Sequence, residues 1–202
     1  MQENLTGGRE RAAIIDTAYR CLAQPHNRPI RMSVILDRSG LSSRAFYRHF
    51  SSKDDLFLAL LQQECNALTA QLDRIVEDTG TTPVDQLAAW IATMFDAVTD
   101  PQRRMHFAVA DSDEVRAAKG YREARERHHE DRERSLTRIL CLGRRDGTLP
   151  LADPEIDALA ISALVSRVIA GQKVDDEQAF ARARARVTDF ALRAVGAPAC
   201  GR

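Results

Sequence analysis

The sequence of 202 residues has little of what marks several protein classes. Its four cysteines, Cys21, Cys65, Cys141 and Cys200, lie far apart and form no C-x-x-C pair, which argues against a zinc site or a disulfide framework. No apolar run reaches the roughly 18 residues of a membrane span. The start of the chain has neither the basic nor the apolar segment of a secretory signal, so we expect a cytoplasmic protein with no membrane partner.

Strand signals are scarce as well. Aromatic residues make up 5% of the chain and no β-branched run alternates with polar residues, whereas apolar residues recur at helical spacing nearly throughout. Hydrophobic residues at 44% and charged residues at 29% suffice for a core and a charged surface, which excludes a disordered chain. The sequence therefore predicts an all-α protein.

Interruptions containing proline or glycine divide this helical pattern. The clearest one covers residues 78–83, and others cover residues 24–29 and 145–153. The segments 1–8 and 196–202 are predicted to be flexible ends. The expected helices cover residues 9–23, 32–38, 42–50, 54–77, 84–98, 101–110, 113–144, 154–171 and 177–195.

The net charge of zero conceals an uneven distribution. Residues 1–53 contain nine basic and four acidic residues, so this part carries a net charge of +5 and the remainder carries −5. Such an asymmetry is expected of a segment that contacts phosphate, but a cluster of charge is more often simply a solvated surface. Charge alone leaves both interpretations open.

Residues 30–56 have the pattern of a helix-turn-helix. Two short helical segments flank Gly40, which can adopt the positive φ of a tight turn between helices. Ser42 and Ser43 open the second segment, where their hydroxyl groups can reach phosphates or base edges in a major groove. The residues expected to pack between the two segments are Ile35, Leu36, Leu41 and Phe46.

The spacing within this block is specific, above all in the stretch YRHFSSKDDL. It resembles the DNA-binding signature of the TetR (tetracycline-repressor-like) family of bacterial transcriptional regulators. The matching positions are Ile35, Gly40, Leu41, Ser42, Tyr47, His49, Phe50, Lys53 and Leu56. Three positions depart from the family pattern, because Arg31 stands where a threonine helix cap is usual, and Leu36 and Ser39 replace small alanines.

The resemblance implies an N-terminal three-helix DNA-binding domain and a larger C-terminal helical domain. In this division, the first domain would cover residues 9–55, a long connecting helix residues 54–77, and an effector-binding and dimerisation domain residues 78–195. The implied partners are a double-stranded DNA operator, a second copy of the chain and a small-molecule effector. No cofactor, metal or enzymatic activity is expected, and repression rather than activation is implied by the resemblance alone.

Roles for individual residues also follow from the resemblance. Tyr47 and Lys53 would bind the DNA backbone, whereas Ser43 and Arg44 would lie near base edges, where arginine can bind guanine with two hydrogen bonds. His49 is also interpreted as a packing residue beside Phe50, and that reading is the favoured one. The candidate DNA-binding residues are Arg31, Ser33, Ser42, Ser43, Arg44, Tyr47, His49 and Lys53.

The segment 156–171 predicts a dimer interface. It carries only two formal charges and is apolar on two sides, so one side can pack in the core while a second subunit covers the other. Burial of this helix and of the last one within a monomer is the alternative. The candidate interface residues are Leu159, Ala163, Val168, Phe180, Val187 and Phe190.

Large apolar side chains of the C-terminal part are candidates for an effector pocket. Such a pocket would suit a hydrophobic or amphipathic small molecule, and plain core packing is the alternative for each residue. The candidates are Trp90, Met94, Phe95, Met105, Phe107 and Tyr121.

Two other functions compete with a DNA-binding regulator. Glu126 and His129 have the Glu-x-x-His spacing of a helical-bundle metalloenzyme, but no second copy of this motif occurs and charged residues surround it. A helical protein-interaction module that does not use its helix-turn-helix on DNA is the other alternative. Steep loss of DNA affinity with salt would distinguish the regulator from this module.

Overall fold

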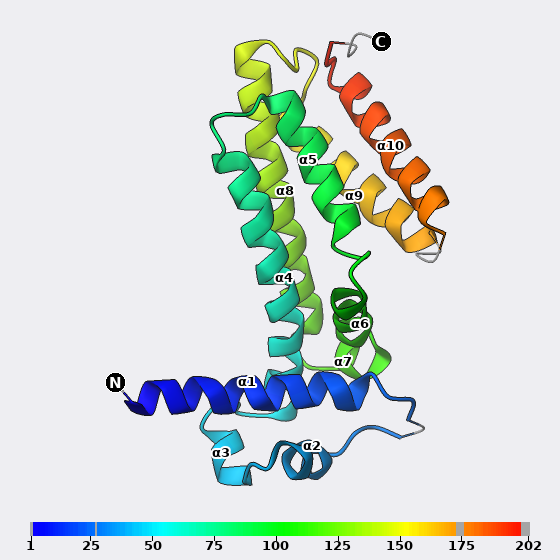
Figure 1. Ribbon diagram of the computed structural model, residues 1–202. Helices are drawn as coiled ribbons and strands as arrows, with labels where there is room; N and C mark the ends of the chain where they lie inside the picture. The colour runs from blue at the N-terminus through cyan, green and yellow to red at the C-terminus, as the bar shows by residue number, and fades with distance from the viewer. Residues whose placement is uncertain (1, 27, 173–175, 199–202) are drawn as a thin grey trace. The chain divides into compact units, whose positions relative to one another are not determined.

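The computed structural model describes residues 2–26, 28–172 and 176–198, and for residues 2–6 it describes the backbone alone. The described residues form ten helices and no strand (Figure 1), which confirms the all-α prediction. None of these helices is long and apolar enough to cross a lipid bilayer. The helices are α1 (Gln2–Leu22), α2 (Met32–Ser39), α3 (Ser43–Tyr47), α4 (Lys53–Glu77), α5 (Pro83–Asp96), α6 (Pro101–Ala110), α7 (Asp113–Arg116), α8 (Tyr121–Asp146), α9 (Pro154–Gly171) and α10 (Glu177–Ala194).

The chain divides into two compact units. The first contains Met1–Cys65 and Pro101–Glu126, and the second contains Asn66–Asp100 and Arg127–Arg202. Because the divisions fall within α4 and α8, each of these long helices contributes to both units.

In the first unit, α1 packs against α2, α3 and α6. Tyr19 of α1 lies in the centre of its core, where its hydroxyl donates a hydrogen bond of 2.6 Å to the carbonyl oxygen of Leu60. The ring of Tyr19 stacks on His106, and His106 Nδ1 lies 2.7 Å from Glu64 Oε1. Burial raises the pKa of the Tyr19 hydroxyl well above its ordinary value. The same core includes Ile35 and Leu36 of α2 and Phe46 of α3, which pack these helices against α1.

In the second unit, α5 packs against α9 and α10, which also lie side by side (Figure 1). Trp90 is fully buried, and its indole N–H donates a hydrogen bond of 2.9 Å to Ser135 Oγ. Phe95 of α5 meets Phe180 of α10 edge to face, with ring centroids 5.1 Å apart. These contacts form a core that is separate from that of the first unit.

The helix boundaries differ most from the sequence prediction in two places, and the helix expected over residues 42–50 is also shorter, covering Ser43–Tyr47. The first helix begins at Gln2 and not at residue 9, and it continues through two glycines. The helix expected over residues 113–144 is instead two helices, because Gly120 adopts φ +89° between α7 and α8. A side chain is disfavoured at this φ, and a Cβ atom at Gly120 would also lie 3.4 Å from Leu58 Cδ1. Gly120 is the sequence signal that the prediction overlooked.

Candidate nucleic-acid interface

The turn between α2 and α3 is built from local sequence signals. Gly40 adopts φ +68°, and its N–H bonds back to the last carbonyl groups of α2. Ser42 caps α3, since its Oγ accepts a hydrogen bond of 3.2 Å from the N–H of Ala45. Arg31 occupies the N-cap position of α2 without a side-chain hydrogen bond, so the departure from threonine leaves this helix uncapped at its start. The turn fixes how α3 follows α2.

The short helix α3 has one buried side and one exposed side. Ala45 and Phe46 are buried, whereas Ser43, Arg44 and Tyr47 are exposed. The side chain of Tyr47 is 68% exposed, and its ring packs edge to face on Phe46 with centroids 5.2 Å apart. An aromatic side chain held rigidly at the surface is available to a partner.

Basic and hydroxyl side chains extend this exposed surface onto α2. Arg31 and Ser33, at the start of α2, are exposed, as is Ser42 at the start of α3. The side chains of Arg31, Ser33 and Arg44 have no hydrogen-bonding or ionic partner among the described residues. Of the eight candidate DNA-binding residues, six are therefore on the exposed surface of α2 and α3, and the other two are His49 and Lys53.

His49 contacts α1. Its side chain is 14% exposed, and Nε2 lies 3.0 Å from Glu10 Oε2. The same carboxylate oxygen accepts a hydrogen bond of 2.7 Å from Arg48 Nη2. The hydrogen bond from His49, together with the charge of Arg48, lowers the pKa of the Glu10 carboxyl. These contacts favour the packing interpretation of His49 over a direct DNA contact.

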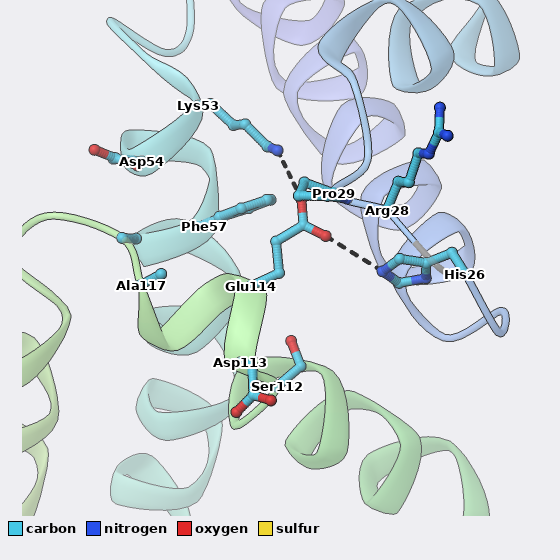
Figure 2. A pocket seen from close by; sticks show the side chains of 11 residues that line it. His26, Arg28, Pro29, Lys53, Asp54, Phe57, Ser112, Asp113, Glu114 and Ala117 are labelled. Atoms are coloured by element: carbon cyan, nitrogen blue, oxygen red, sulfur yellow. Dashed lines mark hydrogen bonds and ion pairs between the residues drawn. The ribbon is translucent and has the colours of Figure 1, made fainter.

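Lys53 is also held internally. At the start of α4, its Nζ donates hydrogen bonds to the carbonyl oxygen of Ile30 at 2.5 Å and to Glu114 Oε1 at 2.6 Å. The ammonium group lies 5.0 Å from the centroid of the Phe57 ring. This ion pair lines an open cavity of about 640 Å³, which His26 and Arg28 also line (Figure 2). The side chain keeps 31% of its surface exposed.

The helix-turn-helix geometry of α2 and α3 agrees with a match to a known sequence family. Residues 14–60 match the family model described as bacterial regulatory proteins, tetR family. The matched segment runs from α1 into α4 and includes the whole helix-turn-helix. Residues 14–60 of this chain therefore belong to the tetR family. No curated protein is similar enough in sequence to count as a match.

Solved structures of TetR regulators share the fold over nearly the whole chain. A complex of SmeT with triclosan is 25% identical, with a TM-score of 0.77 over 95% of this chain and 96% of the other. A second structure of SmeT, the repressor of the Stenotrophomonas maltophilia multidrug efflux pump SmeDEF, is 24% identical with a TM-score of 0.73, covering 94% of each chain. FadR from Bacillus subtilis, in complex with stearoyl-CoA, is 17% identical with a TM-score of 0.73, over 91% of this chain and 98% of FadR. This chain therefore has the fold of a TetR DNA-binding regulator.

The effector-pocket candidates fall in both units of the TetR fold. Trp90, Met94 and Phe95 are buried in the second unit, where they contribute to its core. Met105, Phe107 and Tyr121 belong to the first unit, and the Tyr121 hydroxyl donates a hydrogen bond of 3.0 Å to Asp111 Oδ1. Trp90 and Tyr121 thus have polar partners within the protein, and their place in a pocket stays a prediction.

The dimer-interface candidates separate into two groups. Phe180 and Val187 are buried within the second unit, and Val168 is half-buried. Leu159 and Phe190 are 58% and 52% exposed, and Ala163 is exposed on the same helix as Leu159. The exposed members leave an apolar surface on α9 and α10 that a partner can cover.

Glu126 and His129, the candidate ligands of the alternative metal site, do not lie in a cluster of metal-binding side chains. Glu126 is exposed, whereas the Nδ1 atom of His129 lies 2.6 Å from Arg132 Nη2. Over the part of the chain that the structure describes, no group of three or more His, Cys, Asp or Glu side chains is arranged to hold a metal ion.

The sequence does not predict the two acidic residues that hold His49 and Lys53. Glu10 lies 39 positions before His49, and Glu114 lies 61 positions after Lys53. Neither residue belongs to the helix-turn-helix block, and an isolated acidic residue far along the chain gives no signal of its partner. Only the packing of α1 and α7 onto this domain identifies them.

Proposed function

We propose that this chain is a transcriptional repressor that binds a near-palindromic DNA operator as a homodimer and is released by a small hydrophobic or amphipathic effector. Support for DNA binding comes from the exposed side of α3, which carries Ser43, Arg44 and Tyr47. On the opposite side of this helix, Phe46 is buried in the core and fixes its position. The net charge of +5 on residues 1–53 favours a polyanion as the partner. Within this proposal, Arg31, Ser33, Ser42 and Lys53 are further contacts, and His49 acts by positioning α3.

A homodimer is supported by the apolar surface on α9 and α10. Ile156, Leu159 and Phe190 are all more than half exposed, and apolar side chains of this size favour burial against a second copy. A single short recognition helix reads few base pairs, so two copies about 34–36 Å apart, or a multiple of that distance, would supply the required affinity.

Support for an effector comes from the structural neighbours. SmeT was solved with triclosan and FadR with stearoyl-CoA, both of which are small molecules with large apolar parts. We infer an effector-binding and dimerisation domain over residues 78–195, joined by the helix at 54–77 to a DNA-binding domain over residues 9–55. A regulator of this kind acts by binding and not by catalysis, in the cytoplasm and on the nucleoid.

DNA binding is tested with purified protein and a library of random-sequence duplexes. The proposal predicts that successive rounds of selection enrich one sequence, and that log K for this duplex falls linearly with log salt concentration. A chain that enriches no sequence and retains no duplex at low salt contradicts the proposal, as does a complex that is insensitive to salt.

A further inference from the structure

The Glu114 carboxylate is held by three hydrogen-bonding groups, two of them in the helix-turn-helix and the third on His26 just before it. The N–H of Ile30 lies 2.9 and 3.1 Å from its two oxygen atoms, Lys53 Nζ lies 2.6 Å from Oε1, and His26 Nε2 lies 3.2 Å from Oε2. Figure 2 shows the carboxylate between Lys53 and His26, while the side chain of Arg28 extends away from it. Glu114 itself belongs to α7, outside the helix-turn-helix.

These partners are the kinds of group that bind a phosphate of the DNA backbone. An ammonium ion and a backbone N–H are common donors to phosphate oxygens, and a carboxylate offers the same charge-assisted acceptor. The proposed function assigns Lys53 to a DNA phosphate, but its ammonium group already lies against Glu114. The Glu114 carboxylate thus occupies the place beside Lys53 that a DNA phosphate would take.

A phosphate cannot gain the full attraction of Lys53 while Glu114 remains in place. The negative charge of Glu114, 2.6 Å away, neutralises the ammonium ion and repels an approaching phosphate. The side chain of Glu114 is 14% exposed, so water screens this pair less than it screens a surface pair. DNA must therefore displace the carboxylate or bind without the charge of the lysine, and either course reduces affinity.

We propose that Glu114 competes with a DNA phosphate for Lys53 and thereby lowers the affinity of the protein for DNA. This inference rests on the proposed DNA-binding function. It makes Glu114 a residue that sets affinity from α7, without touching DNA, and makes Lys53 a contact that forms fully only when the two side chains part.

The test compares two substitutions that remove one negative charge from neighbouring positions of α7. Glu114→Gln removes the charge beside Lys53 and keeps an amide oxygen that can accept the hydrogen bond from Ile30. Asp113→Asn is the matched control, since Asp113 is exposed and lines the same cavity. Binding to the duplex selected by the wild-type protein is measured across a range of salt concentrations.

Glu114→Gln is expected to bind this duplex about two- to tenfold more tightly than Asp113→Asn. Its plot of log K against log salt concentration should be steeper by about 0.9, the value for one additional phosphate. The gain should disappear in a Lys53→Met background. If the wild-type protein binds the duplex but Glu114→Gln binds no more tightly than the control, the inference is overturned and the proposed function remains intact. A gain for Glu114→Gln that persists in the Lys53→Met background has the same meaning. Absence of any DNA binding by the wild-type chain overturns both.

A second measurement applies if Glu114→Gln unfolds. A water-soluble carbodiimide joins a lysine and a glutamate in contact through an amide bond, while the carboxylate oxygen leaves with the reagent as a urea. In the free wild-type protein, mass spectrometry should find the peptides of Lys53 and Glu114 joined, and saturating duplex should suppress this product. An equal yield with and without the duplex overturns the inference.

Discussion

His49 Nε2 lies 3.0 Å from Glu10 Oε2, and this contact joins the end of the helix-turn-helix to α1. Arg48 Nη2 reaches the same oxygen at 2.7 Å, so one carboxylate of α1 holds two consecutive basic residues that follow α3. The ring of Phe50, just beyond them, is buried and lies 5.3 Å from the Arg11 guanidinium. Glu10 therefore contributes to the position of α3, although it lies outside the helix-turn-helix.

Loss of the Glu10 charge should change how stability depends on pH. The pKa of Glu10 is lowered in the folded protein, mainly by the hydrogen bond from His49, so the contact stabilises the fold above the ordinary carboxyl pKa and is lost as the pH falls through the lowered value. Glu10→Gln should reduce the free energy of unfolding at neutral pH and flatten its decline below about pH 5. Urea unfolding at a series of pH values measures this.

The matched control for Glu10 is Asp16→Asn. Asp16 pairs with Arg20 one turn further along α1, but both side chains are more than 60% exposed. An exposed pair of this kind contributes little, so the control should change stability by less than about 0.5 kcal/mol. Equal effects of the two substitutions would contradict a positioning role for Glu10.

Tyr47→Phe should weaken DNA binding without affecting the fold. The Tyr47 hydroxyl lies on a side chain that is 68% exposed, so its removal disturbs no internal packing. Loss of one hydrogen bond to a phosphate should cost about 0.5–1.5 kcal/mol, or about two- to twelvefold in affinity. A mobility-shift assay measures the affinity, and the melting temperature and oligomeric state should equal those of the wild type. Unchanged affinity would contradict a contact between the Tyr47 hydroxyl and DNA.

Charged substitutions on the apolar surface should dissociate the dimer. Leu159→Glu on α9 and Phe190→Glu on α10 each place a carboxylate where the proposal buries an apolar side chain. Sedimentation should then show a monomer, whereas Ala185→Glu, at an exposed position on another side of α10, should remain dimeric. If Leu159→Glu and Phe190→Glu sediment like the wild type, the interface lies elsewhere.

His128 should make the protein less stable as the pH falls. Burial lowers the pKa of this imidazole, and no described residue is a hydrogen-bond partner of its Nδ1 atom. The unfolded chain therefore takes up a proton near the ordinary histidine pKa of about 6.5, before the folded protein does. Stability should decline between about pH 6.5 and 5, and His128→Gln should decline less over this range in thermal unfolding. An identical decline in both proteins would assign the effect to other groups.

The helix-turn-helix could be predicted from sequence because its signals are local. Gly40 and Ser42 mark the turn and the cap within three positions, and Phe46 follows at helical spacing. The partners of Lys53 could not be predicted in this way. Glu114 belongs to a helix that reaches Lys53 only through tertiary packing, and no periodicity relates the two positions.

The second unit shows the same limit of sequence reasoning. Apolar periodicity identifies α9 and α10 as amphipathic helices, but it does not distinguish a side that faces the core from one that faces solvent. Phe180 and Phe190 were both interface candidates, yet Phe180 packs on Phe95 and only Phe190 is exposed. Whether each phenylalanine is buried or exposed depends on which helix lies opposite it, and this information comes only from the folded structure.

In the proposed function, the exposed side of α3 reads the DNA sequence. Substitution of Arg44 is the sharpest test of this role, because its side chain is exposed and has no ionic or hydrogen-bonding partner among the described residues. Selection from one random duplex library should be carried out in parallel with the wild-type protein and with Arg44→Ala. The wild type should enrich an inverted repeat, and Arg44→Ala should lose about 1–3 kcal/mol of discrimination at one base pair in each half-site while still binding DNA. The same base preferences from both proteins would contradict the claim.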